Sequence, residues 1–212
     1  GRLFKLLGLG FELLKQELNE LKSRFEENMK EAKKGYEDEK ENICELKYQK
    51  ANSVFMNGNQ GISEGAIKSG LDIYYAYPMT PATGVMHELA KKQKTHNLIV
   101  FQPENEIAVA NAGLGASFTG AKVMVGTSGG GFDLMAEALS FQGMSEIPLV
   151  VYLASRSGPG TGVPTYTSQA DLNIALREGH GEFPRIVIAP GDPIECIEKT
   201  NEAFYLSQKF NS

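Results

Sequence analysis

From about residue 52 onward, short apolar runs alternate with helical patterns, and this alternation limits the possible folds more than any other feature of the chain. Strands are predicted over residues 73–77, 98–102, 122–126, 149–154 and 185–189, with a further apolar run at 54–56. Helices are predicted over residues 61–70, 81–94, 106–118, 132–146 and 193–210. This order is typical of an α/β domain with a mostly parallel sheet flanked by helices, whose ligand site lies at the carboxyl ends of the strands.

The segment before this domain has a different pattern of apolar and charged residues. Over residues 11–36, apolar side chains recur at steps of three and four residues, which predicts one or two amphipathic helices that pack on another part of the protein. Residues 37–51 are highly charged and indicate a solvated linker. We therefore expect a helical segment over 1–51 and an α/β domain over 52–212. No strand follows the last helical pattern, so we expect the domain to be cut short at its C-terminus.

Composition excludes several classes of function. The net charge of −5 and the pI near 5.4 provide no basic field, so we expect no nucleic-acid partner. No window reaches the roughly 18 apolar residues of a membrane span, so no membrane partner is expected. The two cysteines, Cys44 and Cys196, are far apart and lack the spacing of metal ligands. They indicate free thiols in a reducing cytoplasm and no metal site.

The first predicted strand ends in a rigid turn, Y-P-M-T-P-A-T over residues 77–83. Pro78 and Pro81 fix their own backbones and favour extended conformations in the residues before them. Thr80 and Thr83 then present hydroxyl groups near a helix N-terminus, which is a suitable receptor for a carboxylate or a phosphate. The alternative is that one of these threonines only caps the helix.

The second strand end carries two glutamates, Glu104 and Glu106, before a helix rich in alanine and glycine. Side chains this small permit close approach by a neighbouring backbone, which favours burial of a carboxyl group. A buried glutamate can exchange protons with a ligand nitrogen. The alternative is that both glutamates only interact favourably with the helix dipole.

The third strand end, residues 127–132, reads T-S-G-G-G-F and predicts a ligand-binding loop, because glycines let a ligand approach the backbone. The same residues also fit the nucleophile elbow of the α/β-hydrolases. In that reading Ser128 is the nucleophile and Asp171 and His180 follow in the expected order. The chain is short for a hydrolase of that fold, and we keep a serine hydrolase as an alternative.

The fourth strand end, residues 155–165, is a long loop rich in glycine and hydroxyl groups. Arg156 stands near its start, and a guanidinium group suits bidentate capture of a carboxylate. The alternative is an ordinary surface arginine beside a flexible loop. Because this loop leaves the same edge as the turn at Thr80, we expect the two segments to hold one carboxylate between them.

The following motifs stand in order along the chain: GNQGISEGA at 58–66, YPMTPAT, PENEIA, TSGGGFDLMAEA, GMSEIPLV, RSGPGTGVPT and GHGEFPRIV. Together they resemble the alpha subunit of the 2-oxoacid:ferredoxin oxidoreductases over about residues 55–209. The resemblance implies a thiamine-diphosphate-binding fold of the pyrimidine type. It also implies oxidative decarboxylation of a 2-oxoacid to an acyl-CoA with reduction of ferredoxin.

The resemblance also implies residue roles. Glu106 matches the glutamate that hydrogen-bonds the aminopyrimidine ring of thiamine diphosphate and is therefore catalytic as well as cofactor-binding. Thr80 and Arg156 match positions that hold the carboxylate of the 2-oxoacid. Pro78 lies in the turn beside the pyrimidine.

In the glycine-rich loop, Ser128 and Gly129 are the candidate cofactor contacts. The chain departs from the commoner family pattern at Met79, at Ala82-Thr83 and at Gly160, which bears on the choice of substrate more than on the reaction.

The remaining expectations concern partners. The sequence has no glycine-aspartate-glycine run for magnesium and diphosphate, and no cysteines for an iron–sulfur cluster. We therefore expect a beta subunit to supply both, in a hetero-oligomer that uses coenzyme A and ferredoxin and shares the thiamine diphosphate between subunits. Residues 6–36 resemble the tail of the family's gamma domain, with 28–36 as its closing piece. An alternative is a non-catalytic assembly subunit.

Overall fold

The computed structural model describes residues 1–21, 23–47 and 53–212. The chain divides into two compact units, Gly1–Val54 and Phe55–Ser212, and each is considered by itself. The expected domain boundary near residue 52 lies outside the described residues. Within the described ranges, no helix is both long and apolar enough to cross a membrane.

The described residues of the first unit form the helices α1 (Arg2–Leu6), α2 (Phe11–Glu20) and α3 (Phe25–Asp38). The ring of Phe11 meets that of Tyr36 edge-on at 5.2 Å between centroids, and the Tyr36 hydroxyl donates to the Leu9 carbonyl at 3.0 Å. Arg2 pairs with the buried carboxylate of Glu39. Among its described residues, the unit buries no hydrophobic side chain. Its apolar stripes therefore remain accessible within the unit.

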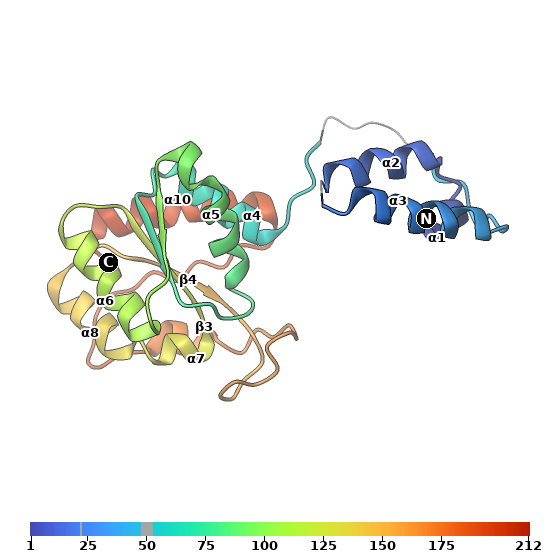
Figure 1. The fold of residues 1–212 in the computed structure, drawn as a ribbon. Helices are drawn as coiled ribbons and strands as arrows, with labels where there is room; N and C mark the ends of the chain where they lie inside the picture. The colour runs from blue at the N-terminus through green and yellow to red at the C-terminus, as the bar shows by residue number, and fades with distance from the viewer. Residues whose placement is uncertain (22, 48–52) are drawn as a thin grey trace. The chain divides into compact units, whose positions relative to one another are not determined.

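The second unit contains a four-stranded sheet in the order β2-β1-β3-β4, and every neighbouring pair is parallel (Figure 1). The strands are β1 (Ile73–Ala76), β2 (Ile99–Phe101), β3 (Val123–Ser128) and β4 (Val150–Ala154). The helices are α4 (Gly58–Lys68), α5 (Thr83–His96), α6 (Glu106–Phe118), α7 (Gly129–Asp133), α8 (Ala136–Ser145), α9 (Leu172–Arg177) and α10 (Pro193–Phe210). The predicted α/β fold with a parallel sheet between helices is confirmed.

The two faces of the sheet are covered by different helices (Figure 1). Successive strand residues point to opposite faces. Tyr74 and Met124 accordingly belong to a core with α4, α5 and α10, whereas Val123 and Val125 belong to a core with α6 and α8. On the second face, α6 packs closely on the sheet, because a Cβ atom at Gly113 would lie 2.7 Å from Cγ1 of Val125.

On the first face, a buried polar contact joins α4 to β4. The Tyr152 hydroxyl donates to Oδ1 of Asn59 at 2.9 Å. Burial raises the pKa of Tyr152 to about 12, because the charged phenolate would lose its hydration. Burial raises the pKa of Tyr74 as well.

The structure corrects several predicted elements. Residues 185–189 form no strand, and neither does the apolar run at 54–56. Ile186 and Val187 are exposed, and a β-branched run becomes a strand only where a neighbouring strand pairs with it. The helix predicted over 132–146 is two helices, α7 and α8, and the short α9 was not predicted.

Candidate functional site

The four strands are parallel, so the loops that follow them all leave from one edge of the sheet. The turn at Thr80 follows β1, and Glu106 begins the helix after β2. Ser128 ends β3, and Arg156 stands two residues beyond the end of β4. The candidate residues from the sequence are therefore brought to the same edge, as expected for a site in a parallel α/β domain.

Arg156 is a buried cation, with 8% of its surface exposed. Its Nη1 atom donates to the backbone carbonyl of Thr80 at 2.9 Å, which joins the end of β4 to the turn after β1. Its Nε atom is buried without a hydrogen-bond partner, and none of the ion pairs among the described residues includes Arg156. Because a buried charge is costly without a counter-ion, Arg156 is poised to accept an anion.

Glu106 is a buried acid, with 4% of its surface exposed. It occupies the first position of α6, but the capping role belongs to Asn105, whose Oδ1 accepts from the Ala108 N–H at 2.9 Å. The Oε1 atom of Glu106 has no hydrogen-bond partner among the described residues. A favourable interaction with the helix dipole does not require such burial, so this carboxyl group is suited to a ligand donor. Its neighbour Glu104 is exposed.

Close packing at the end of β3 encloses this carboxyl group. A Cβ atom at Gly131 would lie 2.8 Å from Oε1 of Glu106 and would also clash with Thr127. The Thr127 hydroxyl is 4.0 Å from the sulfur of Met79, in the turn after β1. Gly131 is therefore needed because α7 approaches Glu106 too closely for any side chain.

Two serines complete the group of buried polar atoms at this edge. The Oγ atoms of Ser128 and Ser155 are both buried without a hydrogen-bond partner among the described residues. Since most buried polar atoms in proteins are hydrogen-bonded, unpartnered atoms from three adjacent loops mark a place where a ligand or another chain supplies the partners.

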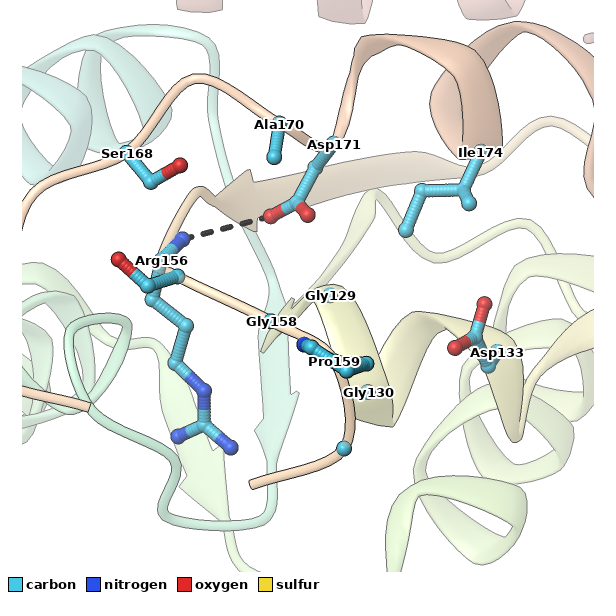
Figure 2. Close-up of a pocket in the computed structure, with 12 residues that line it drawn as sticks. Gly129, Gly130, Asp133, Arg156, Gly158, Pro159, Ser168, Ala170, Asp171 and Ile174 are labelled. Atoms are coloured by element: carbon cyan, nitrogen blue, oxygen red, sulfur yellow. Dashed lines mark hydrogen bonds between the residues drawn. The ribbon is translucent and has the colours of Figure 1, made fainter. Parts of the chain in front are cut away.

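The glycine-rich loops also border a cavity of about 340 Å³ (Figure 2). Its walls include Gly129, Gly130, Gly158 and the half-buried Asp171. The backbone N–H of Arg156 donates to Oδ2 of Asp171 at 3.3 Å, while Figure 2 shows the Arg156 side chain extending away from that carboxylate. Arg156 also lines this cavity, so the buried arginine and the glycine-rich loops belong to one site.

The structure excludes one of the two interpretations of the turn after β1, in which Thr80 or Thr83 caps the following helix. Helix α5 is capped at Ala82 without any side-chain hydrogen bond, so neither Thr80 nor Thr83 caps it. Thr80 and Pro78 are exposed. The Thr80 carbonyl is already engaged by Arg156, and its side chain is available to a ligand at the edge of the sheet.

The structure does not support the hydrolase alternative. The Ser128 Oγ atom is fully buried and makes no hydrogen bond to His180, whose backbone N–H instead donates to Ser140. Ser128 has an ordinary extended backbone, with φ −125°, rather than the strained turn of a nucleophile elbow. Gly126 is required for another reason, since a Cβ atom there would clash with the Tyr74 hydroxyl.

Sequence reasoning missed two features of the site. Ser155 was not singled out, although it stands beside Arg156 at the end of a strand. Asp171 was considered only as a hydrolase residue, and its contact with Arg156 spans 15 positions of the chain. Strand-end position was a usable signal for Ser155, whereas no local pattern marks Asp171.

A parallel α/β sheet with a buried acid and a buried arginine at its carboxyl edge defines a ligand-binding domain for a charged small molecule. Residues 64–212 match the family model described as pyruvate flavodoxin/ferredoxin oxidoreductase, thiamine diphosphate-binding. The chain belongs to this family and carries its thiamine diphosphate-binding domain.

Two curated relatives and one solved structure extend the comparison. The chain is 41% identical over 172 residues to the 2-oxoacid:ferredoxin oxidoreductase subunit alpha of Saccharolobus solfataricus, covering 75% of this chain and 27% of that protein. It is 35% identical to subunit alpha of 2-oxoacid:ferredoxin oxidoreductase 1 of Sulfurisphaera tokodaii, and this match covers 99% of this chain and 36% of that protein.

The solved structure is the 2-oxoglutarate:ferredoxin oxidoreductase of Magnetococcus marinus with 2-oxoglutarate, coenzyme A and succinyl-CoA bound. Its TM-score is 0.84 at 33% identity, with 100% of this chain and 39% of that chain covered. The chain therefore spans well under half the length of these relatives.

Proposed function

We propose that this chain is part of the alpha subunit of a thiamine-diphosphate-dependent 2-oxoacid:ferredoxin oxidoreductase. The complete enzyme would decarboxylate a 2-oxoacid oxidatively, form an acyl-CoA and pass electrons to ferredoxin in the cytoplasm. The proposal is supported by family membership and by the names of the similar proteins.

The observation that carries the proposal is the buried Glu106 carboxyl group with its unpartnered Oε1 atom. A carboxyl group in this position fits a ring nitrogen that donates or shares a proton. Glu106 would hold that proton at Oε1 toward the pyrimidine ring, with Pro78 beside the ring and Ser128 and Gly129 as further cofactor contacts. Bound thiamine diphosphate supplies the carbon–carbon bond chemistry.

The substrate would be held by Arg156 and Thr80. The guanidinium group is buried, lacks an ion-pair partner among the described residues and has a free Nε atom. It offers the carboxylate of a 2-oxoacid a charge-assisted hydrogen bond, and Thr80 adds a hydroxyl group. Orienting the carboxylate in this way places the adjacent carbonyl carbon for reaction.

A beta subunit would supply what this chain does not offer. The described residues contain no group of three potential metal ligands. We assign magnesium, the diphosphate contacts and an iron–sulfur cluster to the partner, with thiamine diphosphate shared in a hetero-oligomer. The unpartnered serines at the strand ends are consistent with a site that another chain completes.

We also propose that residues 1–51 are the helical tail of a gamma-like domain with a charged linker and that residues 52–212 form a pyrimidine-binding domain. The similarity to the Sulfurisphaera protein covers 99% of this chain, whereas the family model begins only at residue 64. This difference supports a helical segment that precedes the thiamine domain in the same polypeptide.

The substitution Glu106→Gln tests the proposed function in the full-length protein assembled with its beta subunit. The amide keeps the shape of the side chain but cannot exchange the proton, so 2-oxoacid-dependent ferredoxin reduction should fall by at least about 100-fold. The melting temperature should stay level or rise, because a neutral amide is easier to bury than a carboxylate.

The matched control is Glu104→Gln, which makes the same change on the exposed neighbour. This variant should retain wild-type turnover. Retained activity in Glu106→Gln would contradict the assignment of Glu106. An inactive wild-type complex that binds no thiamine diphosphate in a calorimetric titration would favour an assembly subunit instead.

A further inference from the structure

Asp171 joins two segments of the site that are far apart in sequence (Figure 2). Its Oδ2 atom accepts a hydrogen bond from the Arg156 backbone N–H at 3.3 Å. Its other oxygen faces the start of α7, where a Cβ atom at Gly129 would lie 2.8 Å from Oδ1. The three atoms nearest to that Cβ position all belong to Asp171. The carboxylate therefore fills the space between the end of β4 and the beginning of α7.

The contact with Asp171 bears directly on the arginine side chain. Arg156 is held at its backbone by Asp171 and at its guanidinium group by the Thr80 carbonyl, at 2.9 Å. With both ends fixed, the free Nε atom keeps a defined direction. If the backbone anchor is lost, the guanidinium group can follow the Thr80 turn and its position is no longer set by the sheet.

We propose that Asp171 is a positioning residue for the 2-oxoacid site, which acts through Arg156 without touching the substrate. The inference rests on the proposed function of this edge of the sheet. Asp171 keeps the loop after β4 aligned with the glycine-rich start of α7, so that Arg156 meets the substrate carboxylate in one orientation. Pre-set orientation of this kind lowers the cost of binding.

The contact requires a hydrogen-bond acceptor at a particular place more than it requires a negative charge. Figure 2 shows the guanidinium group of Arg156 directed away from Asp171, and no ion pair between them is present. Asparagine retains an acceptor oxygen at the same distance from the backbone. Alanine removes the acceptor, and glutamate moves it by one methylene group toward or past Gly129.

The experiment compares Asp171 variants in the full-length protein assembled with its beta subunit, using 2-oxoglutarate and pyruvate as substrates. Loss of this partly buried hydrogen bond to the arginine backbone should raise KM by about tenfold in Asp171→Ala. The kcat of this variant should change by less than about twofold, because the reacting groups are untouched. Asp171→Asn should restore the wild-type KM.

Asp133→Ala is the matched control, since Asp133 is an exposed carboxylate on the same cavity without a hydrogen bond to Arg156. Its KM should equal that of the wild type. Asp171→Glu is the second variant, in case the alanine variant fails to assemble. It keeps the charge but displaces the carboxylate, so its KM should rise as in Asp171→Ala.

The outcomes separate the inference from the function on which it rests. A wild-type complex that leaves both 2-oxoacids unchanged would overturn the proposed function and this inference with it. An active wild-type complex with unchanged KM in Asp171→Ala or Asp171→Glu would overturn the inference alone. A lower kcat and melting temperature at constant KM would show a merely structural role and would equally overturn it.

Discussion

Arg156 combines one hydrogen bond with a free donor on a separate nitrogen atom of the same planar group. One guanidinium nitrogen donates to the Thr80 carbonyl, and a second buried nitrogen has no partner among the described residues. An ammonium group is a single point of charge and lacks this fork. The residue therefore holds the turn after β1 and still presents a donor to an anion.

We expect Arg156→Lys and Arg156→Ala to raise the KM for the 2-oxoacid, by about tenfold or more for alanine, because a charge-assisted hydrogen bond is lost. Steady-state kinetics of the assembled enzyme will measure the effect. Arg177→Ala removes an exposed arginine and should leave KM unchanged. Equal KM values for all three variants would contradict a role of Arg156 in substrate binding.

Because of Tyr152, we expect the free energy of unfolding to fall as the pH becomes alkaline. Its pKa in the folded chain is about 12, above the ordinary value of 10.0, because of burial. The folded state therefore binds this proton more tightly than the unfolded state. The stabilisation is fully present below pH 10 and is lost as the pH rises toward 12. Since one pKa unit corresponds to about 1.4 kcal/mol, the whole loss approaches about 3 kcal/mol.

Chemical denaturation between pH 9 and pH 11 checks this expectation by comparing the wild type with Tyr152→Phe. The phenylalanine variant lacks the hydroxyl bond to Asn59, so it should be less stable at neutral pH but should lose less stability on alkaline titration. Burial, the larger cause of the raised pKa of Tyr74, acts in both proteins, and only the smaller influence of Tyr152 on that pKa is lost in the variant. If the free energy of unfolding fell equally with pH in both proteins, the raised pKa of Tyr152 would be contradicted.

At the scale of elements, α6 offers two glycines in opposite environments. A Cβ atom at Gly113 would lie 2.7 Å from Cγ1 of Val125, whereas Gly115 has open space around it. Gly113→Ala should therefore lower the free energy of unfolding by about 1–3 kcal/mol through overpacking against β3.

In the same helix, Gly115→Ala should raise the free energy of unfolding by about 0.5–1 kcal/mol, since alanine is the better helix former. Urea denaturation of the two variants provides the measurement. A stabilising Gly113→Ala would show that α6 can move away from the sheet.

The elements also show what sequence alone can predict. Periodicity located β1 to β4 and α6 within a few residues, because each has a clear apolar pattern and a polar strand end. The same reasoning failed for residues 185–189, since an apolar β-branched run does not reveal whether a neighbouring strand is available. The parallel topology predicted from the sequence placed Thr80 and Arg156 at one edge of the sheet. The hydrogen bond between them spans 76 positions, so no local sequence pattern could predict it.

At the scale of the whole molecule, the two units differ in their capacity to fold alone. The first unit buries no hydrophobic side chain among its described residues, and its longest helix has 14 residues. Short helices without a core are marginal in water. The second unit has a hydrophobic core on each face of its sheet.

Circular dichroism of separate fragments will test this difference. A fragment of residues 1–47 should show little helix, whereas a fragment of residues 55–212 should unfold cooperatively on heating. Strong helicity and a cooperative transition in the shorter fragment would contradict the expectation.

The unpartnered polar atoms at the edge of the sheet lower the stability of the fold, although the proposed activity requires them. Glu106, Ser128, Ser155 and Arg156 each bury a group that has no hydrogen-bond partner in the part of the chain that the structure describes. Replacement by an apolar or neutral side chain of similar shape relieves that cost. A laboratory selection for heat resistance alone would therefore enrich such replacements, and its most robust clones would retain the fold and lose the site.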